Sequence, residues 1–298
     1  LYLTEEDYAS IGTSVNAHEL KLDSGEKRWV IDDIIGMEDG IGAENLSGSG
    51  AIAGAFSRAY RETFTLTYVS GRTVGIGAYL ARLGIRCIQR ADQPIILTGY
   101  SALNKLLGRE VYSSQMQLGG PKIMGVNGVT HLIVGDDLEG VSAILKWLSY
   151  VPPYVGGPLP SIDPIDPPER AVEYNPELSC DPRAAICGIE SSGKWLSGIF
   201  DKDSFTETLE GWAKTVVTGR ARLGGIPVAI IAVETQTVMQ TIPADPGQLD
   251  SHERVVPQAG QVWFPDSASK TAQALMDFNK EGLPVFIMAN WRGFSGGQ

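Results

Sequence analysis

Proline crowds one stretch of this chain of 298 residues. Nine of its 17 prolines fall between Pro152 and Pro182, in a segment that opens PPYVGGPLPSIDPIDPPER. Because proline lacks a backbone N–H and fixes φ, neither a helix nor a central strand can continue through such a segment. We therefore expect an irregular linker over residues 152–182, which separates one domain over residues 1–151 from another over residues 183–298.

On both sides of this linker, short β-rich runs alternate with helical patterns. The Asp136 carboxylate is placed to cap a helix that runs to Leu148 and has Leu138, Val141, Leu145 and Leu148 on one face. A capping box that begins at Ser204 predicts a second helix, which ends at Gly219 and has apolar residues at helical spacing, namely Phe205, Leu209, Trp212 and Val216. A third helix is expected over residues 269–280. Interleaved strands and helices predict an α/β fold. Strands are expected over residues 63–69, 94–97, 129–134, 227–233 and 283–289.

The charge balance bears on the kind of ligand. The formal net charge of −11 disfavours nucleic acid as a partner, because phosphate binding needs a basic face. The segment over residues 57–90 is a local exception that fits either a small phosphorylated ligand or a solvated face. Its arginines are Arg58, Arg61, Arg72, Arg82, Arg86 and Arg90.

Cysteines, histidines and apolar runs exclude further classes of protein. The 3 cysteines are too few and too irregularly spaced for a disulfide framework, and their odd number fits a reducing compartment. The 3 histidines lie far apart without a metal-binding motif, so no metal site is expected. No apolar run approaches the ~20 residues of a bilayer-spanning helix, so no membrane span is expected.

Two glycine-rich segments repeat one pattern, in which an arginine and then glycines follow a predicted strand. Ser70–Gly77 carries Arg72 and Gly75. Asn290–Gly297 carries Arg292. Such turns leave backbone N–H groups uncovered, so they suit an anion or the negative charge that develops on a carbonyl oxygen. Two copies of one supersecondary unit would explain the likeness, and so would two unrelated tight turns.

Common nucleotide and hydrolase motifs do not fit these turns. A dinucleotide fingerprint that starts at Gly75 needs a third glycine where the chain has Leu80, and no GxxxxGK[ST] loop occurs. The GxSxG elbow at Gly293–Gly297 is not followed within this chain by the acid and histidine that an α/β-hydrolase uses. A serine hydrolase is therefore disfavoured.

Arg292 is the strongest single candidate for a site residue. It lies between Trp291 and Phe294, where its guanidinium could hold a carboxylate through two hydrogen bonds beside aromatic walls. Pairing with a carboxylate of the same chain is the alternative, and the sequence leaves both open. Trp263 and Trp291 likewise suit either a hydrophobic core or a ligand pocket.

Several long motifs resemble one family over essentially the whole chain. They are similar to the carboxyltransferase domain of eukaryotic multidomain acetyl-CoA carboxylases, most of all to the plant-type form. The motifs include SGRTVGIGAYLARLG (70–84), GWAKTVVTGRARLGGIPVAIIAVET (211–235), GQVWFPDSASKTAQA (260–274) and ANWRGFSGG (289–297).

The resemblance implies an α/β fold of two crotonase-like (ClpP/crotonase) β-β-α superhelix domains, both truncated, in an internal fragment of a longer protein. Residues 1–151 would be the C-terminal part of the N-type subdomain. Residues 183–298 would be the N-terminal part of the C-type subdomain.

The resemblance also implies a reaction, in which a carboxyl group passes from carboxybiotin to acetyl-CoA and gives malonyl-CoA for fatty acid synthesis. Biotin would be carried on a domain outside this chain, the coenzyme A thioester would be the substrate, and no metal would act in this segment. The implied partners are the biotin carboxyl carrier, the ATP-dependent biotin carboxylase and a second copy in a homodimer. The isolated fragment is expected to be inactive, and a cytoplasmic location is expected, with the plastid as the alternative.

The resemblance also implies roles for particular residues of this chain, wherever a residue matches the family motif. Arg292 matches the arginine that orients the carboxylate, and Gly296 and Gly297 match an oxyanion turn beside it. Gly75 is implied as a catalytic residue on the opposite wall. Arg72 and Tyr79 are implied to line that wall near the acyl-CoA.

An inhibitor pocket at the dimer interface is implied as well. Its residues are Leu46, Trp263, Trp291 and Phe294. Leu46 stands where sensitive grass plastid enzymes typically have isoleucine, so we expect weak binding of aryloxyphenoxypropionate herbicides.

Two other functions stay open. A β-type subunit of a propionyl-CoA or related acyl-CoA carboxylase shares the implied fold and chemistry, although the TIPADPGQ and GQVWFPDSA motifs favour the multidomain acetyl-CoA form. A non-catalytic acyl-CoA-binding or dimerisation module belongs to a different class.

Overall fold

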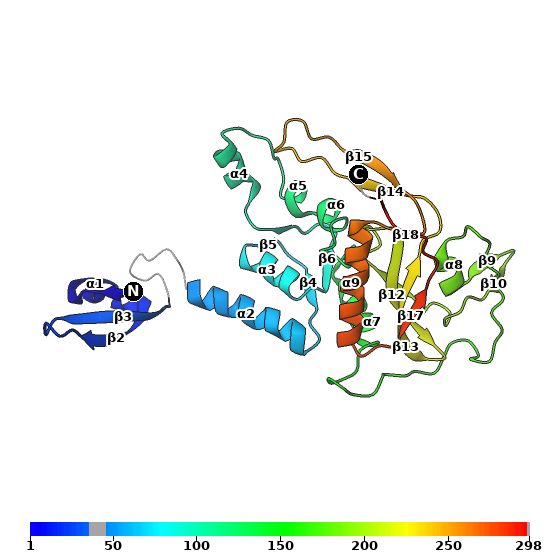
Figure 1. Ribbon diagram of the computed structural model, residues 1–298, viewed down its shortest axis with the longest axis horizontal. Coiled ribbons are helices and arrows are strands. Elements are labelled where there is room, and N and C mark those ends of the chain that lie inside the picture. Colours follow the sequence, from blue (N-terminus) through cyan, green and yellow to red (C-terminus); the bar gives the residue numbers. More distant parts are fainter. Residues whose placement is uncertain (36–45, 297–298) are drawn as a thin grey trace. The chain divides into compact units, whose positions relative to one another are not determined.

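The computed structural model describes residues 1–35 and 46–296 of the chain (Figure 1). The chain divides into two compact units, Leu1–Ala59 and Tyr60–Gln298, which are described separately below. Helix α2 spans Leu46–Glu62 and carries the boundary between them.

The first unit is a small antiparallel sheet with a helix packed on it. Its strands are β1 (Tyr2–Leu3), β2 (Val15–Lys21) and β3 (Lys27–Ile34), in the order β1-β3-β2. Helix α1 (Glu5–Ile11) starts at a capping box, and its Tyr8 ring stacks on Trp29 with 3.9 Å between centroids. A short 3-10 turn, η1 (Gly12–Ser14), joins α1 to β2.

The first half of the second unit is built from parallel strands. One sheet has the order β4-β6-β8, and a separate two-stranded sheet pairs β5 with β7. The strands are β4 (Thr67–Val69), β5 (Thr73–Val74), β6 (Cys87–Arg90), β7 (Ile95–Ile96) and β8 (Leu132–Val134). The helices are α3 (Ile76–Leu83), α4 (Tyr100–Leu107), α5 (Met116–Gly119), α6 (Pro121–Met124) and α7 (Asp137–Leu148).

The second half is organised around a four-stranded sheet of order β11-β12-β13-β17, in which β17 pairs with β13 in parallel. Three two-stranded sheets pair β9 with β10, β14 with β15, and β16 with β18. The strands are β9 (Ile189–Ser191), β10 (Lys194–Leu196), β11 (Thr206–Thr208), β12 (Val216–Leu223), β13 (Ile226–Val233), β14 (Val238–Ile242), β15 (Arg254–Gln258), β16 (Val262–Trp263), β17 (Val285–Met288) and β18 (Gly293–Phe294). The helices are α8 (Pro182–Cys187) and α9 (Pro265–Lys280).

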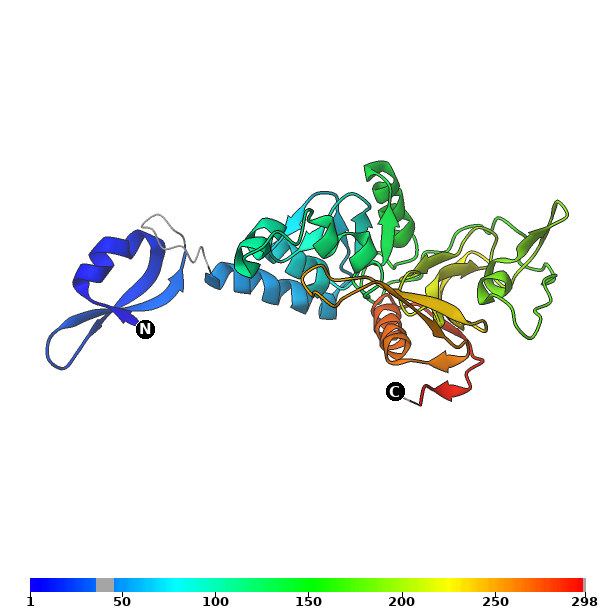
Figure 2. The ribbon, with the colours of Figure 1, turned by 90° about the horizontal axis from the view of Figure 1, so that it is seen from above.

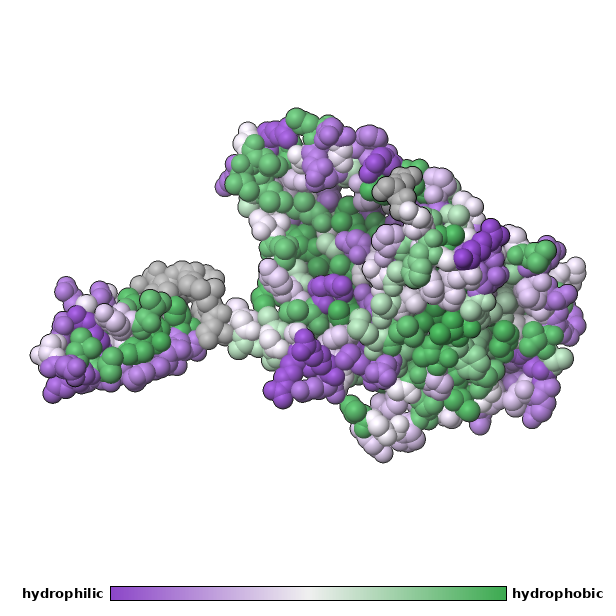
Figure 3. All heavy atoms as spheres, viewed as in Figure 1, coloured by the Kyte–Doolittle hydropathy of each residue, from purple (hydrophilic) through white to green (hydrophobic). Residues whose placement is uncertain are grey.

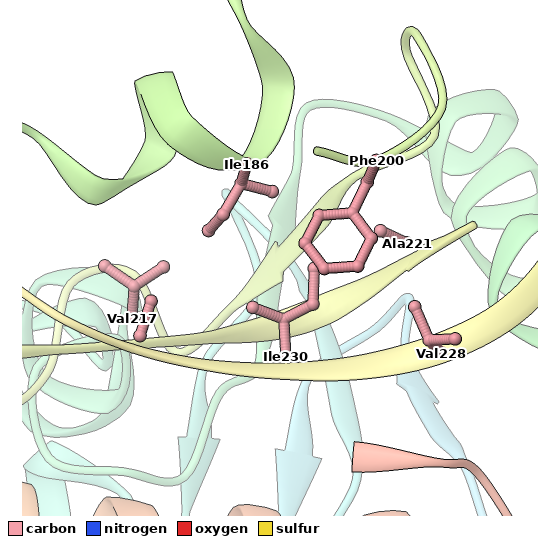
Figure 4. Close-up of a cluster of buried hydrophobic side chains, with 7 residues drawn as sticks. Ile186, Phe200, Val217, Ala221, Val228 and Ile230 are labelled. Atoms are coloured by element: carbon pink, nitrogen blue, oxygen red, sulfur yellow. The ribbon is translucent and has the colours of Figure 1, made fainter. Parts of the chain in front are cut away.

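Strands β12 and β13 are buried on both faces, which explains their almost unbroken apolar sequence. Alternate residues of β13 face opposite sides, since side chains alternate along a strand. On one side Val228 and Ile230 pack with Ile186 of α8 and with Phe200 (Figure 4). On the other side the sheet packs against α9. That second cluster contains Val216, Ala229, Ile231, Ala274, Phe278 and Leu283.

The proline-rich segment has no helix or strand between α7 and α8, as its composition predicts. It is nevertheless held against the second half. The Ile162 N–H donates to the Gly225 carbonyl, and the Arg170 guanidinium donates to the carbonyls of Gly198 and Phe200. The division into domains at residues 152–182 stays a prediction, because the compact units instead meet at residues 59 and 60.

The helix expected after Ser204 does not form, and that prediction is wrong. Residues 206–208 form β11, and Gly219 lies inside β12 instead of capping a helix. A Cβ at Gly219 would come within 2.5 Å of the Phe205 ring, so the glycine permits close packing of two neighbouring strands. The helical spacing of the apolar residues is thus overridden by pairing in the sheet.

Helix α7 follows its sequence prediction closely. The Asp136 carboxylate accepts a hydrogen bond from the Glu139 N–H at 2.9 Å and caps the helix. The apolar residues expected to share one face are exposed, however, while Trp147 on another face is buried. The exposed residues are Leu138, Val141, Leu145 and Leu148.

The two glycine-rich segments form the same strand–turn–strand unit. One joins β4 to β5 and the other joins β17 to β18, and each second strand pairs in parallel with a neighbour. The Gly75 N–H donates to the Ile96 carbonyl at 3.0 Å, and the Ser295 N–H makes the corresponding bond to the Trp263 carbonyl at 2.8 Å. The likeness seen in the sequence is therefore a likeness of backbone structure.

Strand β17 is the edge of its sheet, and its residues are apolar on both faces. Val285, Phe286 and Ile287 are 36%, 39% and 53% exposed. Figure 3 shows hydrophobic residues gathered over this part of the molecule. An uncovered apolar edge strand is a surface at which another chain can add.

Candidate functional site

The turn between β5 and α3 presents backbone donors. Gly75 has φ +60° and ψ −120°, and open space lies where a Cβ would point. A side chain is strained in this conformation, so the glycine is needed for its backbone. The Gly75 N–H is already bonded to Ile96, whereas the N–H groups of Ile76 and Gly77 have no acceptor among the described residues.

Ile76 and Gly77 are therefore candidate donors, and the sequence analysis did not single them out. They open α3, where the first N–H groups of a helix have no partner within the helix. Gly75 acts by setting the direction of this turn. Because a partial positive charge lies at a helix N-terminus, the pair suits an oxyanion. Only the backbone geometry could have assigned the role to these two residues.

Two side chains predicted to bind acyl-CoA lie at this turn. Arg72 immediately precedes β5 and is exposed, and within the described residues its guanidinium makes no hydrogen bond or ion pair. Tyr79 lies in the second turn of α3 and is 52% exposed. Both side chains are thus available to a ligand.

Arg292 holds the corresponding position at the second turn. Its N–H donates to the Gln261 carbonyl at 2.7 Å, which fixes the backbone beside β16. The guanidinium is exposed and meets no carboxylate in the described part of the chain, so pairing within the chain is not observed there. Gly296 has open space where a Cβ would point, and Gly297 lies outside the described residues.

Aromatic rings stack beside Arg292. The ring centroids of Trp263 and Trp291 are 4.1 Å apart, and those of Trp263 and Phe294 are 5.2 Å apart. Trp263 and Trp291 also pack against the hydrophobic core around α9, while Phe294 is 73% exposed. Three residues of the predicted inhibitor pocket therefore lie together. Leu46 belongs to the first unit, and its side chain lies outside the described residues.

The two turns lie apart within the second unit. Figure 1 shows β5 and β18 on different sides of α9, and Figure 2 separates them as well. The candidate site residues of one copy thus fall into two separate groups, one with Arg72, Gly75 and Tyr79 and one with Arg292 and Gly296. We refer to these groups as the two candidate half-sites.

A buried ionic cluster joins the two halves of the second unit. The Glu281 carboxylate accepts from the Nε of Arg86 and from the Nε of Arg220, each at 2.6 Å. Arg86 precedes β6, Arg220 lies in β12 and Glu281 follows α9. No sequence pattern links residues so far apart, so this cluster was not predicted.

The arginine-rich segment over residues 57–90 is therefore not one anion-binding face. Arg86 is fully buried in the ionic cluster. The Arg90 guanidinium donates through Nε to the Asp92 carboxylate at 2.7 Å and through Nη1 to the Asp137 carboxylate at 2.8 Å. Both arginines are used within the structure.

Burial shifts the pKa of groups near this cluster. Burial alone would raise the pKa of Asp277, but His131 and the charge of Arg86 outweigh it and hold the value below its usual range. Burial lowers the pKa of His131, and the hydrogen bond with Asp277 opposes this shift. Burial also lowers the pKa of Lys270 to about 7. The Lys270 ammonium donates to the carbonyls of Leu209 and Trp212, both at 2.9 Å.

The described residues contain neither a metal-binding cluster nor a membrane-spanning helix. Across residues 1–35 and 46–296, no three His, Cys, Asp or Glu side chains gather as a metal ion would require. None of the helices described above is long and apolar enough to cross a bilayer.

With these features in place, the comparisons identify the class of protein. The carboxyl transferase domain family matches residues 5–298, and the chain belongs to that family. It is 80% identical over its full length to acetyl-CoA carboxylase 2 of Arabidopsis thaliana and 78% identical to acetyl-CoA carboxylase 1 of Oryza sativa subsp. japonica. The chain spans 13% of the length of each of these relatives.

A solved structure supports the fold. Transcarboxylase 12S, solved with hydrolysed methylmalonyl-coenzyme A bound, aligns with a TM-score of 0.64 at 19% identity. The alignment covers 86% of this chain and 45% of that one. The mixed α/β architecture is thus shared with a carboxyl-transferring protein.

Proposed function

We propose that the chain carries the carboxyltransferase half-reaction of an acetyl-CoA carboxylase, in which acetyl-CoA becomes malonyl-CoA. The observation that carries this proposal is the 80% identity with acetyl-CoA carboxylase 2 of Arabidopsis thaliana along the whole chain. The geometry agrees with it, since each half-site presents an unpaired arginine beside a backbone turn.

The turn at Gly75 is suited to the thioester carbonyl. When a methyl proton leaves acetyl-CoA, negative charge develops on the thioester oxygen. The free N–H groups of Ile76 and Gly77 can donate to that oxygen, and one such donor typically contributes about 3 kcal/mol to transition-state stabilisation. Open space beside Gly75 leaves room for the acyl group to approach.

The turn at Arg292 is suited to the carboxyl group in transit. Its guanidinium can hold a carboxylate through two parallel hydrogen bonds. The stacked rings of Trp263, Trp291 and Phe294 belong to the same segments, β16 and the turn into β18. Biotin, on a carrier domain outside this chain, would supply the carboxyl group.

We further propose that two copies pair head to tail, so that the Gly75 turn of one protomer faces the Arg292 turn of its partner. Support comes from the separation of the two half-sites within one copy (Figure 1). The repeated strand–turn–strand unit supports two crotonase-like domains, one on each side of residues 152–182. The biotin carboxylase and carrier domains would be further partners.

A reducing, cytoplasmic location is proposed for the protein, with the plastid as the alternative. Its support is limited to Cys87, Cys180 and Cys187, all of which are free thiols. Localisation of a fluorescent fusion would distinguish the two compartments.

Isotope exchange between malonyl-CoA and free biotin tests the proposed reaction in the intact protein that carries this chain. Arg292→Ser should lower the exchange rate by about 100-fold, which corresponds to about 3 kcal/mol. Arg61→Ser, at an exposed arginine of α2, is the matched control and should exchange normally.

The isotope-exchange assay also distinguishes the alternatives to this proposal. Normal exchange in Arg292→Ser would remove Arg292 from the site. Absence of exchange in the unmodified protein would favour a binding or dimerisation module. Faster exchange with methylmalonyl-CoA than with malonyl-CoA would favour a propionyl-CoA carboxylase.

A further inference from the structure

The residue just before β16 has a backbone conformation that is uncommon for any amino acid except glycine. Gln261 has φ +64°, in the left-handed region. Its side chain makes no hydrogen bond within residues 1–35 and 46–296, so the side chain does not account for this conformation. Strained residues persist where surrounding contacts hold them, and they are found most often at functional sites. The backbone contacts of Gln261 are therefore the place to look for a role.

Both main-chain polar groups of Gln261 are hydrogen-bonded. Its N–H donates to the Glu234 carbonyl at 2.8 Å, and its carbonyl accepts from the Arg292 N–H at 2.7 Å. Glu234 directly follows β13, an inner strand of the four-stranded sheet, and Arg292 directly precedes β18. Gln261 thus connects the backbone of Arg292 to the end of that sheet.

The chain segment that follows β13 is itself held in place. The Glu234 N–H donates to the Thr215 carbonyl at 3.0 Å, and the Glu234 carboxylate accepts from the Gln236 N–H at 2.9 Å. The Thr235 hydroxyl donates to the Cys180 carbonyl at 2.7 Å and accepts from the Cys180 N–H at 2.9 Å. These hydrogen bonds make the segment a firm support for β16.

Gly260 allows β16 to approach this support closely. A Cβ at Gly260 would come within 2.4 Å of the Thr235 backbone and within 2.6 Å of the Gln236 carbonyl oxygen. Backbone atoms cannot rotate away as the end of a long side chain can. A side chain at position 260 would therefore push β16 off the support, and the hydrogen bond from Arg292 would carry that displacement to the second half-site.

We propose that Gln261 is a positioning residue for Arg292, acting through its left-handed backbone conformation, and that Gly260 makes this conformation possible at the end of the sheet. The inference rests on the proposed role of Arg292 in holding the carboxyl group. The guanidinium extends from a backbone that Gln261 fixes, so a shift of that backbone changes where the guanidinium reaches. A displacement of about 1 Å in a reacting group can lower a rate about 100-fold.

Substitutions of Gln261 separate its backbone from its side chain. Gln261→Gly adopts a positive φ without strain and should keep the normal rate of malonyl-CoA isotope exchange. Gln261→Val, whose β-branched side chain strongly disfavours a positive φ, should lose at least about tenfold in kcat. Gln248→Val, at an exposed glutamine without a positive φ, is the matched control and should exchange normally.

A double-mutant cycle distinguishes positioning from a general loss of structure. Gly260→Ala alone should lower the exchange rate at least about tenfold, but it should cause no further loss in Arg292→Ser, where the positioned arginine is already absent. Gly198→Ala is the control for crowding. A Cβ there would come within 2.4 Å of the Gly188 nitrogen, beside Ile186 of the other hydrophobic cluster, and the exchange rate should stay normal.

Hydrogen–deuterium exchange at the Arg292 amide gives a readout that does not depend on activity. The amide should be protected in the intact unmodified protein and in Gln261→Gly, and should exchange faster in Gln261→Val and Gly260→Ala. This pattern in a protein without any malonyl-CoA exchange would support the placement of Arg292 by Gln261 and contradict the proposed reaction.

Three results would overturn the positioning role itself. They are normal malonyl-CoA exchange in Gln261→Val, a further loss when Gly260→Ala is added to Arg292→Ser, and unchanged protection of the Arg292 amide in both backbone variants. A loss in Gln261→Gly equal to that in Gln261→Val would assign the effect to the glutamine side chain and would likewise contradict the proposal.

Discussion

At the scale of single residues, Gly75 shows how one backbone conformation positions two donors. Gly75→Ala places a Cβ on a residue with φ +60°, which is strained and should rotate the N–H groups of Ile76 and Gly77. We expect malonyl-CoA isotope exchange to fall about 100-fold, as when an oxyanion donor is lost.

Gly71→Ala is the matched control for this prediction. Gly71 lies in the same turn with open space around its Cβ position and without a positive φ. The Gly71→Ala variant should exchange malonyl-CoA at a rate close to that of the unmodified protein. If both alanine variants were equally active, the conformation of Gly75 would have no role in the site.

Lys270 predicts a distinctive dependence of stability on pH. Its pKa is lowered to about 7 by burial, whereas the unfolded chain keeps the ordinary value near 10.5. Above pH 7 the unfolded chain binds the extra proton, so the free energy of unfolding rises with pH. Between pH 7 and pH 9, it should rise by about 2 kcal/mol more in the unmodified protein than in Lys270→Met.

Urea denaturation at each pH measures this difference in slope. Lys122→Met replaces an exposed lysine and should keep the slope of the unmodified protein. Identical slopes in the unmodified protein and Lys270→Met would contradict the assigned pKa direction.

At the scale of elements, the sequence predicted what local chemistry determines. Helix α7 begins at its Asp136 cap, α9 extends over the expected residues and the proline-rich segment is irregular. The helix expected after Ser204 failed because apolar residues at helical spacing also fit a strand and a buried turn. There Leu209 and Ala213 adopt positive φ. Such positions are stabilised by tertiary contacts, among them the hydrogen bonds from Lys270.

Site residues divide in the same way. Arg292, Gly75 and the aromatic neighbours could be proposed from the sequence because side-chain type and spacing mark them. The candidate donors Ile76 and Gly77 could not, because only their backbone N–H groups are involved and their side chains carry no signal. The contact between Arg86 and Glu281 joins residues 195 positions apart, and a single sequence offers no means of pairing them.

Removing the charge of Glu281 from the buried ionic cluster should lower the free energy of unfolding strongly. Glu281→Gln would leave Arg86 and Arg220 buried beside a neutral amide, so the free energy of unfolding should fall by about 3–5 kcal/mol. Urea denaturation measures it, and Glu169→Gln at an exposed site is the control. A loss no greater than that of the control would show that the cluster does not hold α9 to β6 and β12.

At the scale of the whole molecule, the separated half-sites predict complementation between inactive variants. If each active site combines the Gly75 turn of one copy with the Arg292 turn of its partner, a mixed dimer of Gly75→Ala and Arg292→Ser contains one intact site. Co-expression of the two should restore about a quarter of the normal exchange activity. Mixtures as inactive as either parent would place both turns in the same copy's site.

The backbone conformation of Gly75 also affects how well substitutions would be tolerated at each position of this turn. Replacing Ile76 by another amino acid other than proline leaves its amide in place, so an essential donor would score as a dispensable position. Gly75, whose own amide is committed to the sheet, would score as intolerant instead. Sensitivity to substitution would thus mark the residue that sets the direction of the turn and pass over the proposed oxyanion donors.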